Sequence, residues 1–267
     1  MPCLSPLTGA SRWSWGRRLR TAAGGACRAG LNLLFPPLCA CCQAELPSNG
    51  SDGLLCGGCS QTLAPANVWC PRCGALDVPA DEVTSGCVLC HRTQFHFETV
   101  VPLGLYDGFF SALILRMKVA AGQRLAMAMA RLMLDRRSGE LAALRADLVV
   151  PVPMFWARRL RRGTNSAEIL GGAIARHLEV PMRRALVRQR NTLPQKDLTP
   201  RERFRNVRGA FRLARWRCDL RDRTILLVDD VLTTGATCSE AARVLKAAGA
   251  ARLVVAVLAR GQGDRRS

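Results

Sequence analysis

The sequence predicts an α/β protein in which helices flank a parallel β-sheet, with a small cysteine-rich module ahead of it. Three observations predict this organisation. Eight of the thirteen cysteines lie in four C-x-x-C pairs between positions 39 and 90. After position 95, short apolar runs alternate with segments of helical periodicity. Two adjacent aspartates and a run of small, hydroxyl-bearing residues follow one of the apolar runs.

Length and composition are those of a globular protein. The chain has 267 residues, of which 49% are hydrophobic and 22% charged, enough for one large domain and one small one. The longest apolar run near the end, Leu253–Ala259, has seven residues. A membrane-spanning helix needs about eighteen or more. We therefore expect no membrane span and a cytoplasmic location.

Residues 1–34 are predicted to be a basic N-terminal extension. The first 38 residues contain no acidic side chain. A secretory signal would need an uninterrupted apolar region and a small-residue cleavage site. Arg28 interrupts the apolar stretch 21–34, and Pro36-Pro37 follow it without such a site. The extension is thus favoured over a signal peptide.

The cysteine pairs of residues 35–95 have a regular spacing. Thirteen residues separate the first pair from the second, and thirteen separate the third from the fourth, so that one unit repeats after 31 residues. Such a repeat is typical of two zinc ribbons. The predicted ligands are Cys39, Cys42, Cys56, Cys59, Cys70, Cys73, Cys87 and Cys90.

The chemistry of these cysteines favours structural zinc. A C-x-x-C turn presents two thiolates, and two turns complete a closed Cys₄ shell around Zn²⁺. The few apolar residues of the module form a core that rarely supplies more than ~3–5 kcal/mol, whereas zinc contributes ~10–16 kcal/mol to small fingers. Two alternatives to zinc are less favoured. Disulfides would need an oxidising compartment, for which the sequence has no credible signal. A redox C-x-x-C motif is expected once, beside a βαβ unit, and here the motif occurs four times. The first pair can share a metal ion with the second and the third with the fourth, or the pairs can interleave. The spacing of the cysteines leaves both arrangements open.

Residues 96–267 are predicted to form the larger domain. Strands that alternate with helices favour a parallel, doubly wound sheet, in which ligands bind at the carboxyl ends of the strands. The predicted strands are 99–106, 147–153, 224–228 and 252–259; the predicted helices are 109–118, 125–134, 167–178 and 239–248, with an arginine-rich loop after 153.

The segment 225–237 reads I-L-L-V-D-D-V-L-T-T-G-A-T and carries the clearest chemical signal. Asp229 and Asp230 can accept hydrogen bonds from the two hydroxyls of a ribose, or lie near Mg²⁺. The small residues that follow can surround an anion with backbone N–H groups and hydroxyls at the start of a helix. Charge-assisted hydrogen bonds of this kind contribute ~1.5–3 kcal/mol each. We therefore expect a ribose 5-phosphate ligand, with phosphoribosyl pyrophosphate as the best candidate.

Two other interpretations of the aspartates are weaker. A Walker-B carboxylate pair also follows an apolar strand, but its partner loop needs a glycine before its lysine. None of the three lysines, Lys118, Lys196 and Lys246, follows a glycine. A simple turn cap explains the aspartates but not the ordered T-T-G-A-T at 233–237.

Further stretches make a family resemblance specific. They are L-F-P-P at 34–37, C-P-R-C-G at 70–74, P-V-P at 151–153 leading to R-G-T-N at 162–165, and R-N-T at 190–192. With these, residues 225–237 resemble the phosphoribosyl pyrophosphate signature of type I phosphoribosyltransferases. The chain from about Leu31 to Arg260 resembles the ComF family of competence-associated proteins. This chain departs from the family pattern at two positions. The family usually has an aromatic residue where this chain has Thr164, and a glutamine where this chain has Ser166.

The resemblance implies a type I phosphoribosyltransferase-like fold and roles for individual residues. Asp229 and Asp230 would bind the ribose hydroxyls, and Mg²⁺ would accompany the pyrophosphate. Residues 189–206 would form a mobile loop over the site. The implied phosphate-binding residues are Thr233, Thr234, Gly235, Ala236 and Thr237; the pyrophosphate-loop candidates are Arg158, Arg159, Arg161 and Arg162; the mobile-loop candidates are Arg190, Gln195, Arg203 and Arg205.

Two classes of function follow. In the first, the protein is a phosphoribosyltransferase with an unidentified acceptor. In the second, it is a non-catalytic, zinc-containing competence factor that binds single-stranded DNA. The two need not exclude each other. The net charge of +19 is compatible with a nucleic-acid partner. An aromatic content of 5% provides few surfaces for base stacking. We expect a protein that binds phosphoribosyl pyrophosphate and is linked to DNA uptake, with single-stranded DNA and competence proteins as partners.

Overall fold

A computed structural model describes residues 35–47, 54–66, 68–76, 87, 90, 93–193, 198–214 and 219–261. The basic extension predicted for 1–34 lies outside the described residues. The chain divides into two units, Met1–Cys56 and Gly57–Ser267. The boundary predicted from sequence, between a cysteine-rich module at 35–95 and a larger domain at 96–267, stays a prediction.

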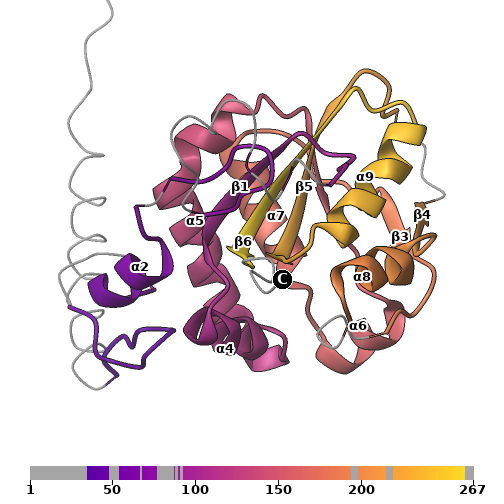
Figure 1. The fold of residues 1–267 in the computed structure, drawn as a ribbon. Helices are drawn as coiled ribbons and strands as arrows, with labels where there is room; N and C mark the ends of the chain where they lie inside the picture. The colour runs from indigo at the N-terminus through magenta and orange to yellow at the C-terminus, as the bar shows by residue number, and fades with distance from the viewer. Residues whose placement is uncertain are drawn as a thin grey trace, which may run out of the picture. The chain divides into compact units, whose positions relative to one another are not determined.

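The centre of the second unit is a four-stranded sheet in the order β1-β6-β5-β2 (Figure 1). All three strand pairs are parallel, which confirms the predicted α/β class. The strands are nearly continuous runs of buried apolar residues, as expected for a sheet covered on both faces. Their bounds are Thr99–Leu105 for β1, Leu148–Pro151 for β2, Thr224–Leu232 for β5 and Arg252–Arg260 for β6.

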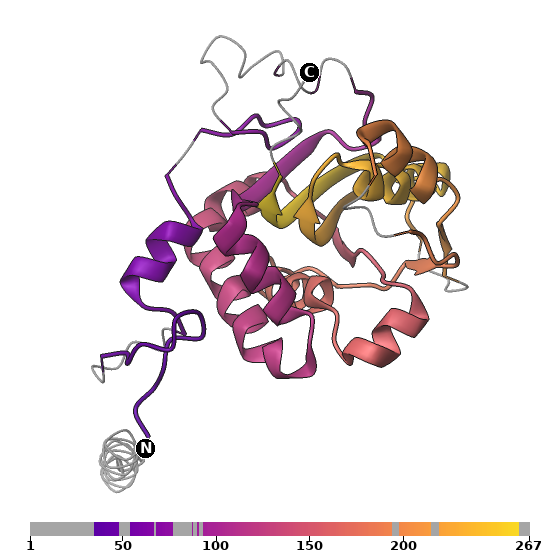
Figure 2. The same cartoon turned by 60° about the horizontal axis from the view of Figure 1, so that its bottom comes forward.

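Helices cover both faces of the sheet. α5 contacts α7 and β1, and α7 also packs on β2 and β5, whereas α9 packs on β5 and β6. Figures 1 and 2 show α9 on one face and α5 and α7 on the other. No helix in the described ranges is both long and apolar enough to cross a bilayer. The bounds are Gly57–Leu63 for α2, Gly108–Met117 for α4, Gln123–Ala143 for α5, Ser166–His177 for α7 and Ala236–Ala247 for α9.

The arginine-rich segment after Pro153 is helical, where a loop is predicted. Helix α6 covers Trp156–Arg162 and ends at Gly163, whose φ of 73° is left-handed. Trp156 and Leu160 are exposed, so this helix buries little apolar surface and gives no amphipathic period. The short 3₁₀ turn η1 (Ala120–Gly122) precedes α5, which continues nine residues beyond the predicted end at 134.

A further helix, α8 (Pro200–Val207), begins within the segment 189–206 and ends one residue beyond it. Its start is specified locally: Thr199 and Glu202 form a capping box, and Pro200 occupies the first turn. Two strands that the sequence analysis does not predict, β3 (Leu186–Arg188) and β4 (Phe211–Leu213), pair antiparallel on either side of this segment. They have three residues each, too few for a periodic signal.

Candidate functional site

A pocket of about 510 Å³ lies at the carboxyl ends of the central strands. This is the edge of a parallel sheet at which ligands bind. Two carboxyl groups and five basic side chains face it, along with two threonine hydroxyls that follow β5. The polar lining residues are Asp229, Asp230, Thr233, Thr237, Tyr106, Asn165, Thr192, Lys118, Arg158, Arg162, Arg188 and Arg203.

Strand β5 continues beyond Val228, so both aspartates belong to it. Adjacent strand residues point to opposite faces of a sheet. The Oδ1 atom of Asp229 accepts from the N–H of Asp230 at 2.9 Å, and its Oδ2 lies 3.9 Å from the thiol of Cys238 in α9. Asp230 Oδ2 lies 3.4 Å from Lys118 Nζ and accepts from Ser166 Oγ at 3.3 Å. Separate elements therefore fix the two carboxyl groups.

The environment of Asp229 changes its protonation. Burial raises the pKa of Asp229 to about 8, and the charge of Asp230 acts in the same direction. The N–H of Asp230 and the cations Lys118 and Arg188 act in the opposite direction. Near neutral pH, Asp229 thus keeps its proton. The pair then offers one hydrogen-bond donor and several acceptors to a ligand with hydroxyl groups.

The segment Thr233–Thr237, here called the phosphate loop after its predicted ligand, runs from the end of β5 into the first two residues of α9. Gly235 has φ 80° and ψ −1° and directly precedes the helix. A Cβ atom at Gly235 would lie 2.7 Å from the ring of Phe95, so the close approach of this ring also requires glycine. Thr233 and Thr237 line the pocket. The first backbone N–H groups of α9 lack intrahelical acceptors and can therefore bind an anion.

The four predicted arginines of α6 are in different environments. Arg158 and Arg162 line the pocket, and Nη2 of Arg158 donates to the carbonyl of Thr192 at 2.7 Å. Arg159 instead forms a two-pronged ion pair with Glu168 on α7. Arg161 belongs to α6, but its side chain lies outside the described part of the structure.

The predicted mobile-loop residues are also separated. Arg203 lines the pocket, and its Nε donates to the carbonyl of Leu198 at 2.9 Å. Nη2 of Arg190 donates to the carbonyls of Asn206 and Arg208 at 2.8 and 2.7 Å, which ties it to the end of α8. Arg205 lines a different cavity of about 570 Å³ beside α9. Gln195 lies outside the described residues.

Two further basic residues, which no sequence motif indicates, reach the pocket. Lys118 follows α4 and Arg188 ends β3, and both side chains reach the pocket. Burial lowers the pKa of Arg188, and the nearby charge of Arg158 acts in the same direction. Its Nε is buried without a hydrogen-bond partner in the described part of the chain. A buried, unsatisfied donor on a cation favours an anionic ligand at this place.

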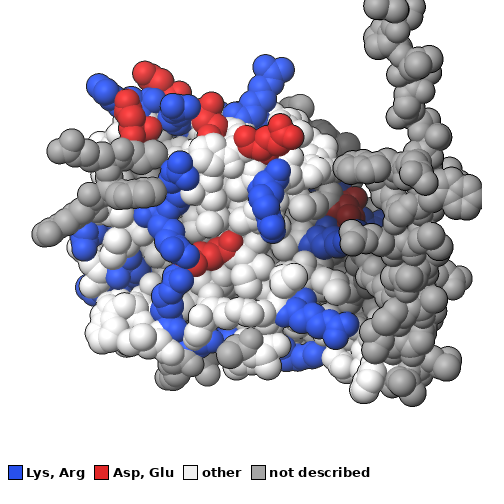
Figure 3. Space-filling view, turned by 180° about the vertical axis from the view of Figure 1, so that it is seen from behind, with Lys and Arg blue, Asp and Glu red and all other residues white. Residues whose placement is uncertain are grey.

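Basic side chains are also spread over the molecular surface. Figure 3 shows them in several groups on one face, with acidic side chains between some of them. This pattern agrees with the net charge of +19. A nucleic acid could contact such a surface through its phosphates.

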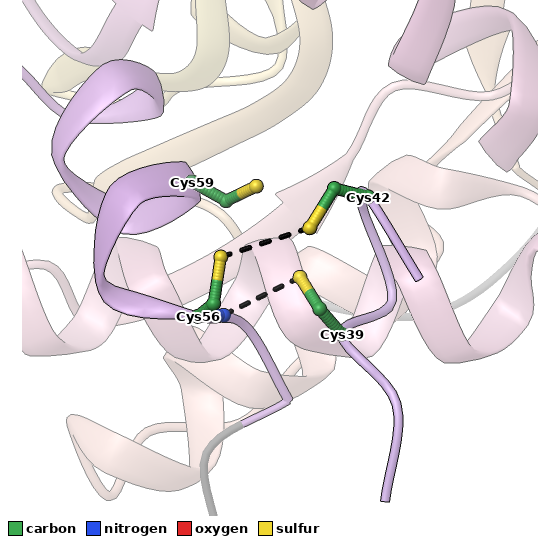
Figure 4. Close-up of side chains that lie close together, drawn as sticks. All are labelled: Cys39, Cys42, Cys56 and Cys59. Atoms are coloured by element: carbon green, nitrogen blue, oxygen red, sulfur yellow. Dashed lines mark hydrogen bonds between the residues drawn. The ribbon is translucent and has the colours of Figure 1, made fainter. Parts of the chain in front are cut away.

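The eight predicted cysteine ligands form two clusters in the structure. The first cluster is Cys39, Cys42, Cys56 and Cys59 (Figure 4), and the second is Cys70, Cys73, Cys87 and Cys90. Within each, the sulfur atoms lie within 4.8 Å of one another. The grouping is the sequential one, first pair with second and third with fourth.

The spacing of the sulfur atoms suits a tetrahedral metal ion. Zn–S bonds of about 2.3 Å place the sulfurs of a Cys₄ shell about 3.8 Å apart. The observed distances are 3.7 Å for Cys42–Cys56, 3.8 Å for Cys70–Cys90 and 3.4 Å for Cys73–Cys87. Both clusters can therefore hold a metal ion.

The local backbone prepares Cys39 as a ligand. Burial raises the pKa of its thiol, but backbone N–H donors from Cys42, Cys56 and Cys41 outweigh burial and lower the pKa to about 6. The N–H of Cys56 lies 3.3 Å from Cys39 Sγ, and Figure 4 shows this contact. A thiolate, the form that binds metal, is thus favoured at neutral pH.

Comparisons with known proteins identify the family of this chain. Residues 164–267 match the family model described as the phosphoribosyl transferase domain. The DNA utilization protein YhgH of Escherichia coli K12 is 33% identical over 234 residues, covering 85% of this chain and 99% of that protein. Competence protein F of Haemophilus influenzae is 30% identical over 212 residues, covering 77% of this chain and 90% of that protein.

Similarity to solved structures is weaker. Glutamine phosphoribosylpyrophosphate amidotransferase of B. subtilis is 20% identical, with a TM-score of 0.33 over 52% of this chain and 27% of that chain. The assignment of the fold rests on the family match and the parallel sheet instead.

Proposed function

Because this chain belongs to the ComF family, we propose that its pocket binds phosphoribosyl pyrophosphate or a related ribose 5-phosphate ligand. One observation carries the proposal: the carboxyl pair Asp229/Asp230 lines the same pocket as Thr233 and Thr237 of the phosphate loop and three arginines, Arg158, Arg162 and Arg188. The carboxyl groups suit the ribose hydroxyls. The loop suits the 5-phosphate, and the arginines suit the pyrophosphate.

The same arrangement suits transfer of the phosphoribosyl group. As pyrophosphate leaves C1, the ribose gains positive character and the leaving group gains negative charge. The arginines, together with Mg²⁺ carried by the pyrophosphate, would stabilise that charge. The acceptor is unidentified. Release of pyrophosphate from phosphoribosyl pyrophosphate, measured with bases, nucleotides and DNA as acceptors, distinguishes transfer from binding alone.

We also propose that the two cysteine clusters hold structural zinc. The sulfur distances match a Cys₄ shell, and four protein ligands leave no coordination position for substrate. Zinc in these clusters stabilises the segments that contribute the cysteines.

The binding proposal is tested by calorimetry with magnesium phosphoribosyl pyrophosphate. The variant carrying both Asp229→Asn and Asp230→Asn is expected to lose binding, because amides accept the ribose hydroxyls less well and change the charge of the pocket. Asp219→Asn is a matched control, since Asp219 is exposed and pairs with Arg221. Unchanged affinity in a folded double variant would show that the ligand does not use this pair.

A second candidate function is binding of single-stranded DNA. The name of the Escherichia coli relative refers to DNA utilization, and the net charge of this chain is +19. Binding through phosphates weakens steeply as salt rises. If DNA binds the basic surface, the affinity of the protein for DNA should fall as salt rises from 50 to 200 mM, a range in which losses of about 10³-fold occur. The variant with both aspartates changed should then still bind DNA. Loss of DNA binding in that variant would place DNA in the pocket instead.

A further inference from the structure

The second cysteine cluster lies directly on the central sheet. The carbonyl of Pro71, within the turn between Cys70 and Cys73, accepts from the N–H of Val100 in β1 at 2.8 Å. Gly74 closes the turn with φ 69°, and a Cβ atom there would lie 2.8 Å from the side chain of Val100. The turn that supplies two metal ligands is therefore packed against an edge strand of the sheet.

One buried side chain connects this turn to the phosphate loop. Arg260, the last residue of β6, is only 4% exposed. Its Nε donates to the carbonyl of Cys73 at 2.7 Å. Its Nη1 donates to the carbonyls of Leu232, at 3.3 Å, and of Thr233. Because the guanidinium group is planar and rigid, it fixes a metal-ligand residue and the first residue of the phosphate loop relative to each other.

A second side chain makes a separate connection. Phe95 packs against the buried residues of the second cysteine cluster. The same ring would lie 2.7 Å from a Cβ atom at Gly235, the residue of the phosphate loop with left-handed backbone. Phe95 is stacked on Phe97, with ring centroids 4.7 Å apart, so its position is constrained on that side too. The cluster thus supports the phosphate loop at both Thr233 and Gly235.

The charge of Arg260 gives the metal a further role. A buried cation is costly unless it is hydrogen-bonded and its charge is balanced. A Cys₄ shell around Zn²⁺ carries net negative charge, because four thiolates outweigh one divalent ion. The metal-loaded cluster would therefore balance Arg260, and loss of metal would change the position of the Cys73 carbonyl that binds it.

We propose that the metal ion of the second cysteine cluster controls ligand binding at the phosphate loop, with Arg260 as the positioning residue between them. This inference rests on the proposed function. The metal-loaded protein binds a ribose 5-phosphate ligand, and loss of metal from this cluster weakens binding. Coupling between two sites is reciprocal, so the ligand must also slow the loss of the metal.

The first measurement is calorimetric titration of ribose 5-phosphate into zinc-loaded wild type, Arg260→Gln and Arg252→Gln. Arg252 is a matched control in the same strand, where it pairs with Glu98 at the opposite end of β6. We expect affinity to fall at least about tenfold in Arg260→Gln and to change less than about twofold in Arg252→Gln. Wild-type affinity in a folded, zinc-loaded Arg260→Gln protein would overturn the inference. Wild type that binds neither ribose 5-phosphate nor magnesium phosphoribosyl pyrophosphate would instead refute the proposed function.

The second measurement uses wild type alone and does not depend on folding of a variant. Zinc release to a chelator is followed with saturating ribose 5-phosphate and with the same concentration of ribose, which has no phosphate. The inference predicts slower zinc release with ribose 5-phosphate only. Equal release rates in a protein that binds ribose 5-phosphate would contradict it.

Discussion

Asp229 has a chemistry that departs far from that of an ordinary carboxyl group. The sequence identifies it as the end of an apolar strand followed by a small-residue loop. It does not reveal that Cys238 faces the carboxyl group or that burial changes its protonation. That information depends on α9 packing against β5, which only the folded chain provides.

Because of Asp229, the free energy of unfolding should decrease as pH rises. Its folded-state pKa of about 8 exceeds the ordinary carboxyl value of 3.8, so the folded chain binds more protons than the unfolded chain between these values. Stability then falls as pH rises through this window. Asp229→Asn removes the effect and should raise the melting temperature more at pH 8.5 than at pH 6. The expected difference is several degrees, because each pKa unit crossed in this window corresponds to ~1.4 kcal/mol and ~1 kcal/mol shifts the melting temperature of a chain of this size by ~2–4 °C.

Thermal unfolding of wild type, Asp229→Asn and Asp219→Asn at both pH values checks this. Asp219 is exposed, and hydrogen bonds from Arg221 lower its pKa, so its variant should not show a gain that grows with pH. An equal gain for Asp229→Asn at pH 6 and 8.5 would mean that Asp229 is ionised throughout.

Among the elements, those with strong periodicity are predictable and the short ones are not. The strands at 99–105, 224–232 and 252–260 follow from apolar runs, because a sheet covered on both faces requires them. Helix α6 and strands β3 and β4 are too short, or bury too little apolar surface, to give a periodic sequence pattern. Lys118 and Arg188 are missed because distant elements place them beside the aspartates.

Helix α8 has a start signal that could have been found from sequence. Thr199-Pro200 followed by Glu202 is a capping box with proline in the first turn, inside a segment interpreted as a loop. The helix positions Arg203 at the pocket, so its local stability bears on ligand binding.

Removing the cap should loosen α8. Thr199→Ala deletes the hydroxyl that accepts from the N–H of Glu202, which costs ~1 kcal/mol in typical helices. Amide hydrogen exchange in residues 202–207 should then accelerate about fivefold. Thr62→Ala is a suitable control, since Thr62 is exposed within α2 and donates to the carbonyl of Gly58. Unchanged exchange in α8 would show that tertiary contacts alone hold the helix.

At the scale of the whole molecule, the cysteine spacing is the most informative feature of the sequence. It predicts the eight ligands, and the structure groups them into two sets of four. The choice between sequential and interleaved sets could not be made from spacing, because both use the same residues. The contacts of the second cluster with β1 and Arg260 join distant parts of the chain, which no local pattern encodes.

Purified protein should contain about two zinc ions per chain, as two Cys₄ shells require. Cys90→Ser should reduce this to about one ion and lower the melting temperature. Cys41→Ser is the matched control, because Cys41 is buried beside the first cluster in sequence but belongs to neither cluster. Metal analysis after gel filtration measures the number of zinc ions per chain in the three proteins. Folded wild type without zinc would refute the zinc assignment.

A crystal structure of the zinc-loaded protein with ribose 5-phosphate tests the proposed pocket most directly. The phosphate should lie against the backbone N–H groups and hydroxyls of Thr233–Thr237, and the 2′ and 3′ hydroxyls should contact Asp229 and Asp230. The ligand bound at another surface, or a phosphate that contacts only the arginines of α6, would contradict the central claim.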